Sequence, residues 1–417
     1  MIRKLTTLSL AAGALLLGAC YEDGTLNSPA TPTGGELMTR YVAMGNSITA
    51  GFQSAGIMDS TQQQSYSHLI ALAAGTPYYY KKLRFRGCAP PFTNNVTQTR
   101  FTLPGFPAST GTTCDLLVPQ ELPWQSNTAV PGARMIEATT NFDSAGGGLA
   151  SASNALTTLF LGGKTQADVM EEAQPTLVTV WLGNNDVLGA LTNATNPGNP
   201  LLVTQTAKFQ AGTDALFSRL DATGAKVLII GVVNVTVIPY ATQGLVLFCA
   251  RNPGVGGCPA GPAFPVATFT VNANCAASTI LVPWSKYLPM IAASAGGTPT
   301  QLDCSVDNVV STTAETNGMT AAVTAYNSYL STQAAAHGFA FWDPNPTLLA
   351  HVANGDIPVI PNLAPALGGG SVTFGTYFTL DGVHPSYLAH KLIADSVASN
   401  LNANFGTTIP MPSTVAP

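Results

Sequence analysis

Short apolar runs alternate with longer amphipathic stretches along most of the chain. The first run, 40–45 ("RYVAMG"), has the hydrophobicity of a buried strand, and 64–75 ("QSYSHLIALAAG") has the period of an amphipathic helix. Near-continuous apolar strands separated by helices are typical of a parallel sheet that is covered on both faces. The pattern predicts an α/β fold, a three-layer α/β/α sandwich around a central parallel sheet. Further strands are expected at 176–183, 226–235 and 339–343, and further helices at 206–224 and 321–338.

Two long stretches, 78–125 and 241–313, interrupt this alternation. Both are rich in Pro, Gly, Ala and Thr, show little periodicity and contain cysteines. Loops of such length in a compact domain are usually functional or cross-linked. Neither stretch shows an obvious core of its own, so we interpret both as insertions in one domain that spans 39–404. The remaining 405–417 are expected to form a frayed tail.

The N-terminus has the pattern of an export signal. Arg3 and Lys4 precede an apolar run of about a dozen residues, which is too short to span a bilayer. The run ends in "LGAC", which resembles the bacterial lipobox and implies that 1–19 are removed and Cys20 carries lipid. Tyr21 follows instead of aspartate, so the resemblance favours the outer membrane of a bacterial cell envelope. Residues 20–38 are expected to be a solvated tether, and an ordinary signal peptide with an incidental cysteine is the alternative.

Composition and charge narrow the classes of partner. The chain has 417 residues, 46% of them hydrophobic and only 9% charged, which is enough to bury a large core. The net charge is −5 with 16 Lys and Arg, so the basic surface that nucleic-acid binding requires is absent from the sequence. We therefore do not expect a nucleic-acid partner.

The cysteine count agrees with export. Apart from Cys20 there are six cysteines, and an even number in an oxidising compartment suggests up to three disulfides. Fifteen pairings of six cysteines are possible, and we expect the local ones. These are Cys88 with Cys114, Cys249 with Cys258, and Cys275 with Cys304. A metal site is the competing interpretation, but neither a close CxxC pair nor HExxH occurs, so no metal is predicted.

Polar residues follow the predicted strands. Ser47 lies in "GNSI" after the first strand, Gly132 in the turn "AVPGA", and Asn185 in "GNND" after 176–183. Asp381 and His384 lie in "DGVH" before the last helix. Because ligands bind at the carboxyl ends of parallel strands, we expect these four segments to meet at one edge of the sheet.

These residue types suit acyl transfer from an ester. A serine hydroxyl is a weak nucleophile unless a histidine removes its proton, and a carboxylate orients that histidine. Ser47, His384 and Asp381 are the candidates for these roles. The tetrahedral intermediate needs hydrogen-bond donors at its oxyanion, for which the backbone N–H groups of Ser47 and Gly132 and the side-chain amide of Asn185 are candidates.

In these four blocks the sequence resembles the SGNH family of GDSL-type hydrolases, from about residue 39 to 402 of the chain. The resemblance implies a flavodoxin-like fold, ester hydrolysis without metal or organic cofactor, and the residue roles given above. Asn46 replaces the usual aspartate of the first block, and we expect only a local effect with activity retained. The other hydrolase signature, G-x-S-x-G, fails at Thr49, which disfavours the α/β-hydrolase fold.

Each block alone has a structural interpretation. Ser47 would cap a helix, Gly132 would be a turn glycine, Asn185 and Asp186 would cap the next helix, and His384 would begin the last one. Only the presence of all four blocks in this order along the chain favours a catalytic site. The four tryptophans are expected to pack in the core or the insertions. They are Trp124, Trp181, Trp284 and Trp342, and Trp284 is also a candidate for the entrance of a pocket.

The resulting hypothesis is a serine esterase or lipase, monomeric and lipid-anchored, that acts on small-molecule, lipid or glycan esters. The first alternative is a carbohydrate O-acetyl esterase, which would use the same residues with a different pocket. The second is an inactive surface lipoprotein that binds a ligand. Sequence alone leaves the natural substrate open.

Overall fold

The computed structural model describes residues 31–140, 154–260, 266 and 268–414. The predicted signal peptide 1–19 and the lipidation candidate Cys20 lie outside the described residues. The chain folds as an α/β protein around a parallel sheet of order β1-β4-β5-β10. Its strands are β1 (Tyr41–Gly45), β4 (Leu177–Trp181), β5 (Lys226–Ile230) and β10 (Ala340–Trp342).

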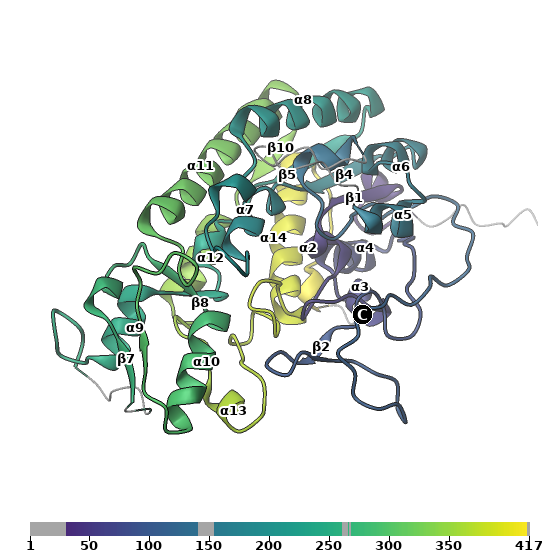
Figure 1. Ribbon diagram of the computed structural model, residues 1–417. Helices are drawn as coiled ribbons and strands as arrows, with labels where there is room; N and C mark the ends of the chain where they lie inside the picture. Colours follow the sequence, from purple (N-terminus) through teal and green to yellow (C-terminus); the bar gives the residue numbers. More distant parts are fainter. Residues whose placement is uncertain (1–30, 141–153, 261–265, 267, 415–417) are drawn as a thin grey trace, which may run out of the picture.

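Both faces of the sheet are buried. Along β1, Val42 and Met44 belong to one hydrophobic cluster, whereas Tyr41 and Ala43 belong to a second one. Successive side chains of a strand point to opposite faces, so the two clusters lie on either side of the sheet. Figure 1 shows the helices beside the sheet, and the prediction of an α/β fold with a central parallel sheet is confirmed. One layer contains α4 (Tyr66–Ala74) and α14 (Tyr387–Phe405), and the other contains α6 (Gln166–Glu172), α8 (Thr206–Thr223) and α11 (Thr313–Ala336).

The remaining elements are short and lie mostly in the connections. The helices are α2 (Ser47–Ala50), α3 (Asp59–Gln63), α5 (Ala155–Leu161), α7 (Asn185–Leu191), α9 (Gly244–Arg251), α10 (Trp284–Ala295), α12 (Asn345–Ala353) and α13 (Ala364–Leu367). The short strands are β2 (Phe92–Asn94), β3 (Thr99–Arg100), β6 (Ala241–Gln243), β7 (Phe269–Val271), β8 (Leu281–Pro283) and β9 (Thr300–Leu302). Single 3₁₀ turns occur at Glu36–Met38, Met135–Ala138, Pro200–Leu202, Val235–Val237, Ala273–Cys275 and Pro412–Thr414.

The edge of the sheet beside β1 is extended by a segment without a strand of its own. Ala43 donates its N–H to the carbonyl of Ser126 at 2.7 Å, and Thr128 donates to the carbonyl of Ala43 at 2.9 Å. Val130 then donates to the carbonyl of Gly45 at 3.1 Å. This pairing leads the chain to the carboxyl end of β1, where the turn containing Gly132 begins.

The second insertion differs from expectation because its buried residues form a hydrophobic cluster separate from the two beside the sheet. Buried residues such as Leu247, Val282 and Tyr287 pack with Val372 and Phe374 from a later segment. The cluster is assembled from short, separated elements, which is why no apolar period is visible in the sequence. All three expected disulfides are present, Cys88–Cys114 in the first insertion and Cys249–Cys258 and Cys275–Cys304 in the second.

Described residues on either side of the expected domain, 39–404, also pack against it. The last part of the predicted tether packs on α4, since Gly34 donates to the carbonyl of Ala74 and Met38 is fully buried. The predicted frayed tail folds back on α14, where Asn402 donates to the carbonyl of Ile409, which is 3% exposed. Apolar burial at these two points compensates the entropy of ordering the ends.

No helix within the described residues is long and apolar enough to cross a membrane.

Candidate active site

Ser47 begins α2 directly after β1, at the carboxyl end of the strand. Asn46 precedes the helix and its Oδ1 accepts the N–H of Ile48 at 3.1 Å, which fixes the start of the helix. Gly51 ends it in the left-handed region at φ 90°. A short helix between two caps holds Ser47, which is 7% exposed, in one orientation at the sheet edge.

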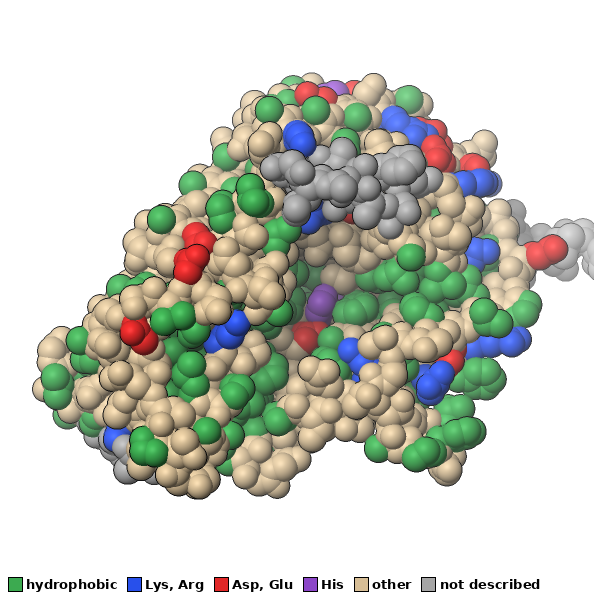
Figure 2. Space-filling view, viewed as in Figure 1, with side chains coloured by type: hydrophobic (Ala, Val, Ile, Leu, Met, Phe, Trp, Pro, Cys, Tyr) green, Lys and Arg blue, Asp and Glu red, His purple; other side chains and the backbone are tan. Residues whose placement is uncertain are grey.

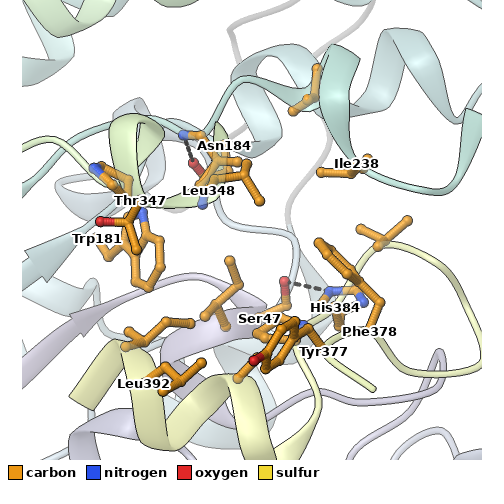
Figure 3. A pocket seen from close by; sticks show the side chains of 18 of the residues that line it. Ser47, Trp181, Asn184, Ile238, Thr347, Leu348, Tyr377, Phe378, His384 and Leu392 are labelled. Atoms are coloured by element: carbon orange, nitrogen blue, oxygen red, sulfur yellow. Dashed lines mark hydrogen bonds between the residues drawn. The ribbon is translucent and has the colours of Figure 1, made fainter. Parts of the chain in front are cut away.

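A chain of hydrogen bonds connects Ser47, His384 and Asp381. Nε2 of His384 lies 2.8 Å from Oγ of Ser47 (Figure 3). Nδ1 of His384 lies 2.8 Å from Oδ2 of Asp381. Because a carboxylate can only accept, Nδ1 carries the proton and the lone pair of Nε2 faces the serine hydroxyl. This is the arrangement in which a histidine can remove a proton from serine.

Asp381 is held as a carboxylate. Burial acts to raise its pKa, but the charge of His384 and hydrogen bonds from His384 and Val383 outweigh it and lower the pKa from 3.8 to about 2. Oδ1 accepts the backbone N–H of Val383 at 2.9 Å and that of His384 at 2.8 Å. Asp381 therefore stays ionised and fixes the orientation of the imidazole at every pH above this value.

A turn in the loop after α2 adds a further donor to Asp381. The N–H of Ala55 lies 2.6 Å from Oδ2 of Asp381. Ser54 and Ala55 both have positive φ, 52° and 53°, inside a turn closed by hydrogen bonds between Gln53 and Gly56. Such values are unfavourable for residues with a Cβ and cluster at functional sites. Sequence reasoning missed this contact because the donor is backbone.

Asn185 is linked to the turn that contains Gly132. Its Nδ2 donates to the carbonyl of Ala133 at 2.9 Å and retains a second hydrogen. Gly132 has φ 85°, a conformation that favours glycine, and its N–H has no acceptor among the described residues, nor does that of Ser47. Ser47, Asn185 and His384 line the same cavity, and Gly132 lies beside it in the turn that Asn185 holds. These two N–H groups and one amide hydrogen of Asn185 are therefore without an acceptor among the described residues.

Asp186 does not have the capping role expected of it. The residue before α7 is Asn184, and no side chain caps the helix. Oδ2 of Asp186 instead accepts the N–H of Met135 at 2.9 Å, next to the turn that contains Gly132. Asn185 and Asp186 together fasten this turn to α7, so the interpretation as mere helix caps is wrong.

Comparison with protein families decides the assignment, because the sequence model of the GDSL-like Lipase/Acylhydrolase family matches residues 41–397. The chain belongs to this family. The GDSL-like hydrolases are ester hydrolases, and the four blocks with their hydrogen bonds lie inside the matched region.

Among solved structures, this GDSL-like hydrolase is similar to an extracellular lipase from Streptomyces rimosus, with 14% identity, a TM-score of 0.35, and coverage of 87% of this chain and 98% of that one. It is also similar to phospholipase A1 from Streptomyces albidoflavus NA297, with 13% identity, a TM-score of 0.32 and the same coverages. At these scores neither likeness bears on the function. No curated protein matches the chain.

An apolar cavity of about 140 Å³ adjoins the serine of this GDSL-like hydrolase. Its volume is close to that of an engineered cavity of roughly 150 Å³ that binds benzene. Figure 2 shows a hollow in this face that holds a histidine and is bordered by hydrophobic side chains. Side chains from α2, from the ends of β4 and β10 and from α12 and α14 line the cavity (Figure 3), among them Ile48, Trp181, Trp342, Leu348, Leu392 and Ile393.

The tryptophans that line the cavity are not the one expected from the sequence. Trp181 and Trp342 line the cavity. Trp284, the candidate entrance residue of the second insertion, packs instead against Phe374 from a later segment and is not among the lining residues. Sequence offered no signal for this, because both cavity tryptophans end apolar strands and have the pattern of core residues. Trp124 contacts Tyr79 in the first insertion.

The remaining histidines mostly have structural contacts. His390 is fully buried, and burial lowers its pKa to about 3, so the ring is neutral and accepts the N–H of Tyr66. His337 pairs with Asp221 at the end of α11. His351 pairs with Asp356 and lines the cavity. Within the described ranges, no group of three His, Cys, Asp or Glu is placed to hold a metal ion.

Proposed function

We propose that the protein is a serine esterase that cleaves carboxylic esters through a covalent acyl-enzyme on Ser47. The observation that carries the proposal is the continuous chain of hydrogen bonds from Ser47 Oγ through His384 to Asp381. Membership of an ester-hydrolase family supports the reaction class. The assignment of each residue rests on the geometry.

In the first half of the reaction, Nε2 of His384 takes the hydroxyl proton as Oγ of Ser47 bonds to the ester carbonyl carbon. The carbonyl oxygen becomes negative and is stabilised by the N–H groups of Ser47 and Gly132 and the amide of Asn185. When the intermediate collapses, the bond to the alcohol oxygen breaks and His384 protonates the leaving alcohol. The acyl group remains on Ser47.

In the second half, His384 takes a proton from water as the water oxygen attacks the acyl carbon. The intermediate collapses by breaking the bond to Oγ, and His384 returns the proton to Ser47. A carboxylic acid is released and the free enzyme is restored. Asp381, with its pKa of about 2, stabilises the imidazolium in both halves while remaining ionised.

The cavity favours an apolar acyl group over acetyl. Side chains such as Trp181, Leu348 and Leu392 offer a surface that an acetyl group would leave unfilled. Burying each methylene of a longer chain contributes about 0.8 kcal/mol. We therefore infer a medium-length acyl chain as the preferred substrate group, and activity confined to acetyl esters would instead indicate the carbohydrate O-acetyl esterase.

The test is the hydrolysis of p-nitrophenyl esters by the Ser47→Ala variant. We expect a loss on the order of a millionfold in turnover, as for a triad that acts as a unit. Ser396→Ala is the matched control, because Ser396 lines the same cavity and its Oγ donates only to Leu392 within its own helix. Retained activity of Ser47→Ala would refute the assignment.

We also propose that the enzyme is exported and anchored through lipid on Cys20. The N-terminal pattern supports this, as do three disulfides, which persist in oxidising compartments. Cells that express the wild type should incorporate labelled palmitate into the protein, which should fractionate with membranes. Cys20→Ser should abolish the label, and an unlabelled wild type would indicate an ordinary signal peptide.

A further inference from the structure

The three most exposed large hydrophobic side chains of the described residues all lie in the first insertion. Leu116 is 74% exposed, Phe106 67% and Phe85 64%. Single exposed hydrophobic residues are common, but contiguous patches mark interaction surfaces. The arrangement of these three side chains therefore matters more than their number.

The fold of the insertion brings the side chains of Phe85 and Phe106 together and places Leu116 on the neighbouring segment. Arg84 donates its N–H to the carbonyl of Leu116 at 3.1 Å, which places Phe85 beside that strand-like segment. Phe85 and Phe106 line one shallow hollow together with Leu103. The Cys88–Cys114 disulfide links the two segments nearby. We call Phe85, Leu103, Phe106 and Leu116 the apolar tip.

The backbone of Phe85 gives a second, independent observation. Its φ is 46°, in a turn closed by the N–H of Gly87 and the carbonyl of Arg84 at 3.0 Å. Glycine or asparagine is usual at such a position, and a bulky residue there is a strained outlier. Neither backbone preference nor packing favours phenylalanine here, so its exposed ring needs another explanation.

Basic residues concentrate beside the apolar tip. Lys81, Lys82, Arg84 and Arg86 are four of the sixteen Lys and Arg in the chain and fall within six positions. Lys82 pairs with Asp59 and Arg86 with Asp115. Lys81 and Arg84 make no ion pair with any described residue, so the surface keeps a positive charge. Hydrophobic side chains rimmed by cations are typical of surfaces that bind anionic lipid.

The insertion is also connected to the active site. Nη1 of Arg100 donates to the carbonyl of Ala55 at 2.8 Å, and the N–H of Ala55 donates to Asp381. In Figure 2 the hollow and a group of hydrophobic side chains on the protruding loops of the first insertion appear on the same face. A surface that seats against the tip would therefore face the cavity.

We propose that the apolar tip and its basic rim dock the enzyme on an anionic phospholipid bilayer. The aromatic and leucine side chains enter the interface while Lys81 and Arg84 contact lipid phosphates. This docking is separate from the lipid on Cys20 and from the chemistry of Ser47. It would keep the opening of the cavity at the surface from which ester substrates partition.

The experiment uses the full mature chain with Cys20→Ser, which removes the proposed lipid attachment. Co-sedimentation with vesicles of phosphatidylcholine and phosphatidylglycerol should show binding that weakens with salt and with removal of phosphatidylglycerol. Phe85→Asn/Phe106→Ser/Leu116→Ser should weaken binding roughly tenfold or more. Arg84→Gln should weaken it roughly fivefold. Leu201→Ser, at a residue 54% exposed outside the insertion, is the matched control and should bind as the parent does.

Three further readouts separate docking from a structural role. Phe85→Asn alone should keep or raise the melting temperature while weakening vesicle binding, because asparagine tolerates positive φ. All variants should keep hydrolysis of a water-soluble short ester. Vesicle binding that is equal in parent and triple variant would overturn the proposal, as would self-association of the parent that the triple variant abolishes, which would indicate a second copy as the occupant.

Discussion

Ser47 and His384 are separated by 337 positions in the chain, yet Oγ of Ser47 and Nε2 of His384 lie 2.8 Å apart. Two sets of local hydrogen bonds produce this contact. The side chain of Asn46 fixes the start of α2, and the backbone hydrogen bonds that Asp381 accepts fix the turn that carries His384. The positions of both side chains are therefore set by local backbone structure at the sheet edge.

Asn185 is expected to act in the reaction as well as in the fold. Asn185→Ala should lower kcat by roughly a hundred- to a thousandfold, the effect of losing one oxyanion donor. Its contact with the carbonyl of Ala133 also holds the turn that contains Gly132. The melting temperature of the variant must therefore be measured beside its kinetics, to show that the turn is still folded. An unchanged kcat in a stable variant would show that Asn185 only fastens the turn.

The cavity predicts a dependence on acyl chain length that a single substitution should change. Leu392→Trp fills the cavity and should abolish turnover of the octanoate ester while leaving the acetate ester within about threefold. Leu388→Trp is the control, since Leu388 lies one turn earlier on α14, is 46% exposed and does not line the cavity. The kinetics of both esters are measured in parallel. Equal losses on the two esters in Leu392→Trp would show that the cavity does not bind the acyl chain.

Asp381 should contribute to catalysis and to stability in different ways. Asp381→Asn should lower kcat on the order of ten-thousandfold because the imidazole loses its correct tautomer. The pKa of Asp381 is lowered from 3.8 to about 2, so its contribution to stability is present above pH 3.8 and is lost as the pH falls towards 2.

The direction of this pH dependence of stability can be measured. Between pH 5 and pH 2 the wild type should lose about 2 kcal/mol more unfolding free energy than Asp381→Asn, from roughly 1.4 kcal/mol per pKa unit. Denaturant unfolding at the two pH values measures the difference. A variant that loses as much stability as the wild type would show that Asp381 is not held as an unusually acidic carboxylate.

Asn46 takes the place of the aspartate of the usual first block. Its Oδ1 accepts the N–H of Ile48, a contact that a carboxylate oxygen can also make. Asn46→Asp should therefore change kcat/KM by less than about tenfold, whereas Asn46→Ala should cost about 1 kcal/mol of stability through loss of the cap. A large gain or loss in Asn46→Asp would mean that the missing charge matters to the chemistry.

The sequence predicted the sheet and its helices because buried parallel strands and amphipathic helices leave a regular pattern. It also placed Ser47, Asp381 and His384 at one edge, since polar residues after strands meet there. It missed Ala55, whose contribution is a backbone N–H with no side chain to recognise, and the cavity role of Trp181 and Trp342, which have the pattern of core residues.

The ends and the second insertion escaped prediction for a related reason. Met38 and Ile409 are single apolar residues in polar segments, so their burial depends on what α4 and α14 leave uncovered. The core of the second insertion combines Leu247 and Tyr287 with Phe374. Packing between such distant segments leaves no local period.

The most direct test of Ser47 as a nucleophile activated by His384 is covalent labelling of the folded protein with a fluorophosphonate, followed by peptide mapping. The probe reacts with a serine whose proton is removed by a neighbouring base. We expect one adduct per chain, located on Ser47, and none in a folded His384→Ala variant. An adduct on another serine, or an unlabelled Ser47 in the folded wild type, would contradict this expectation.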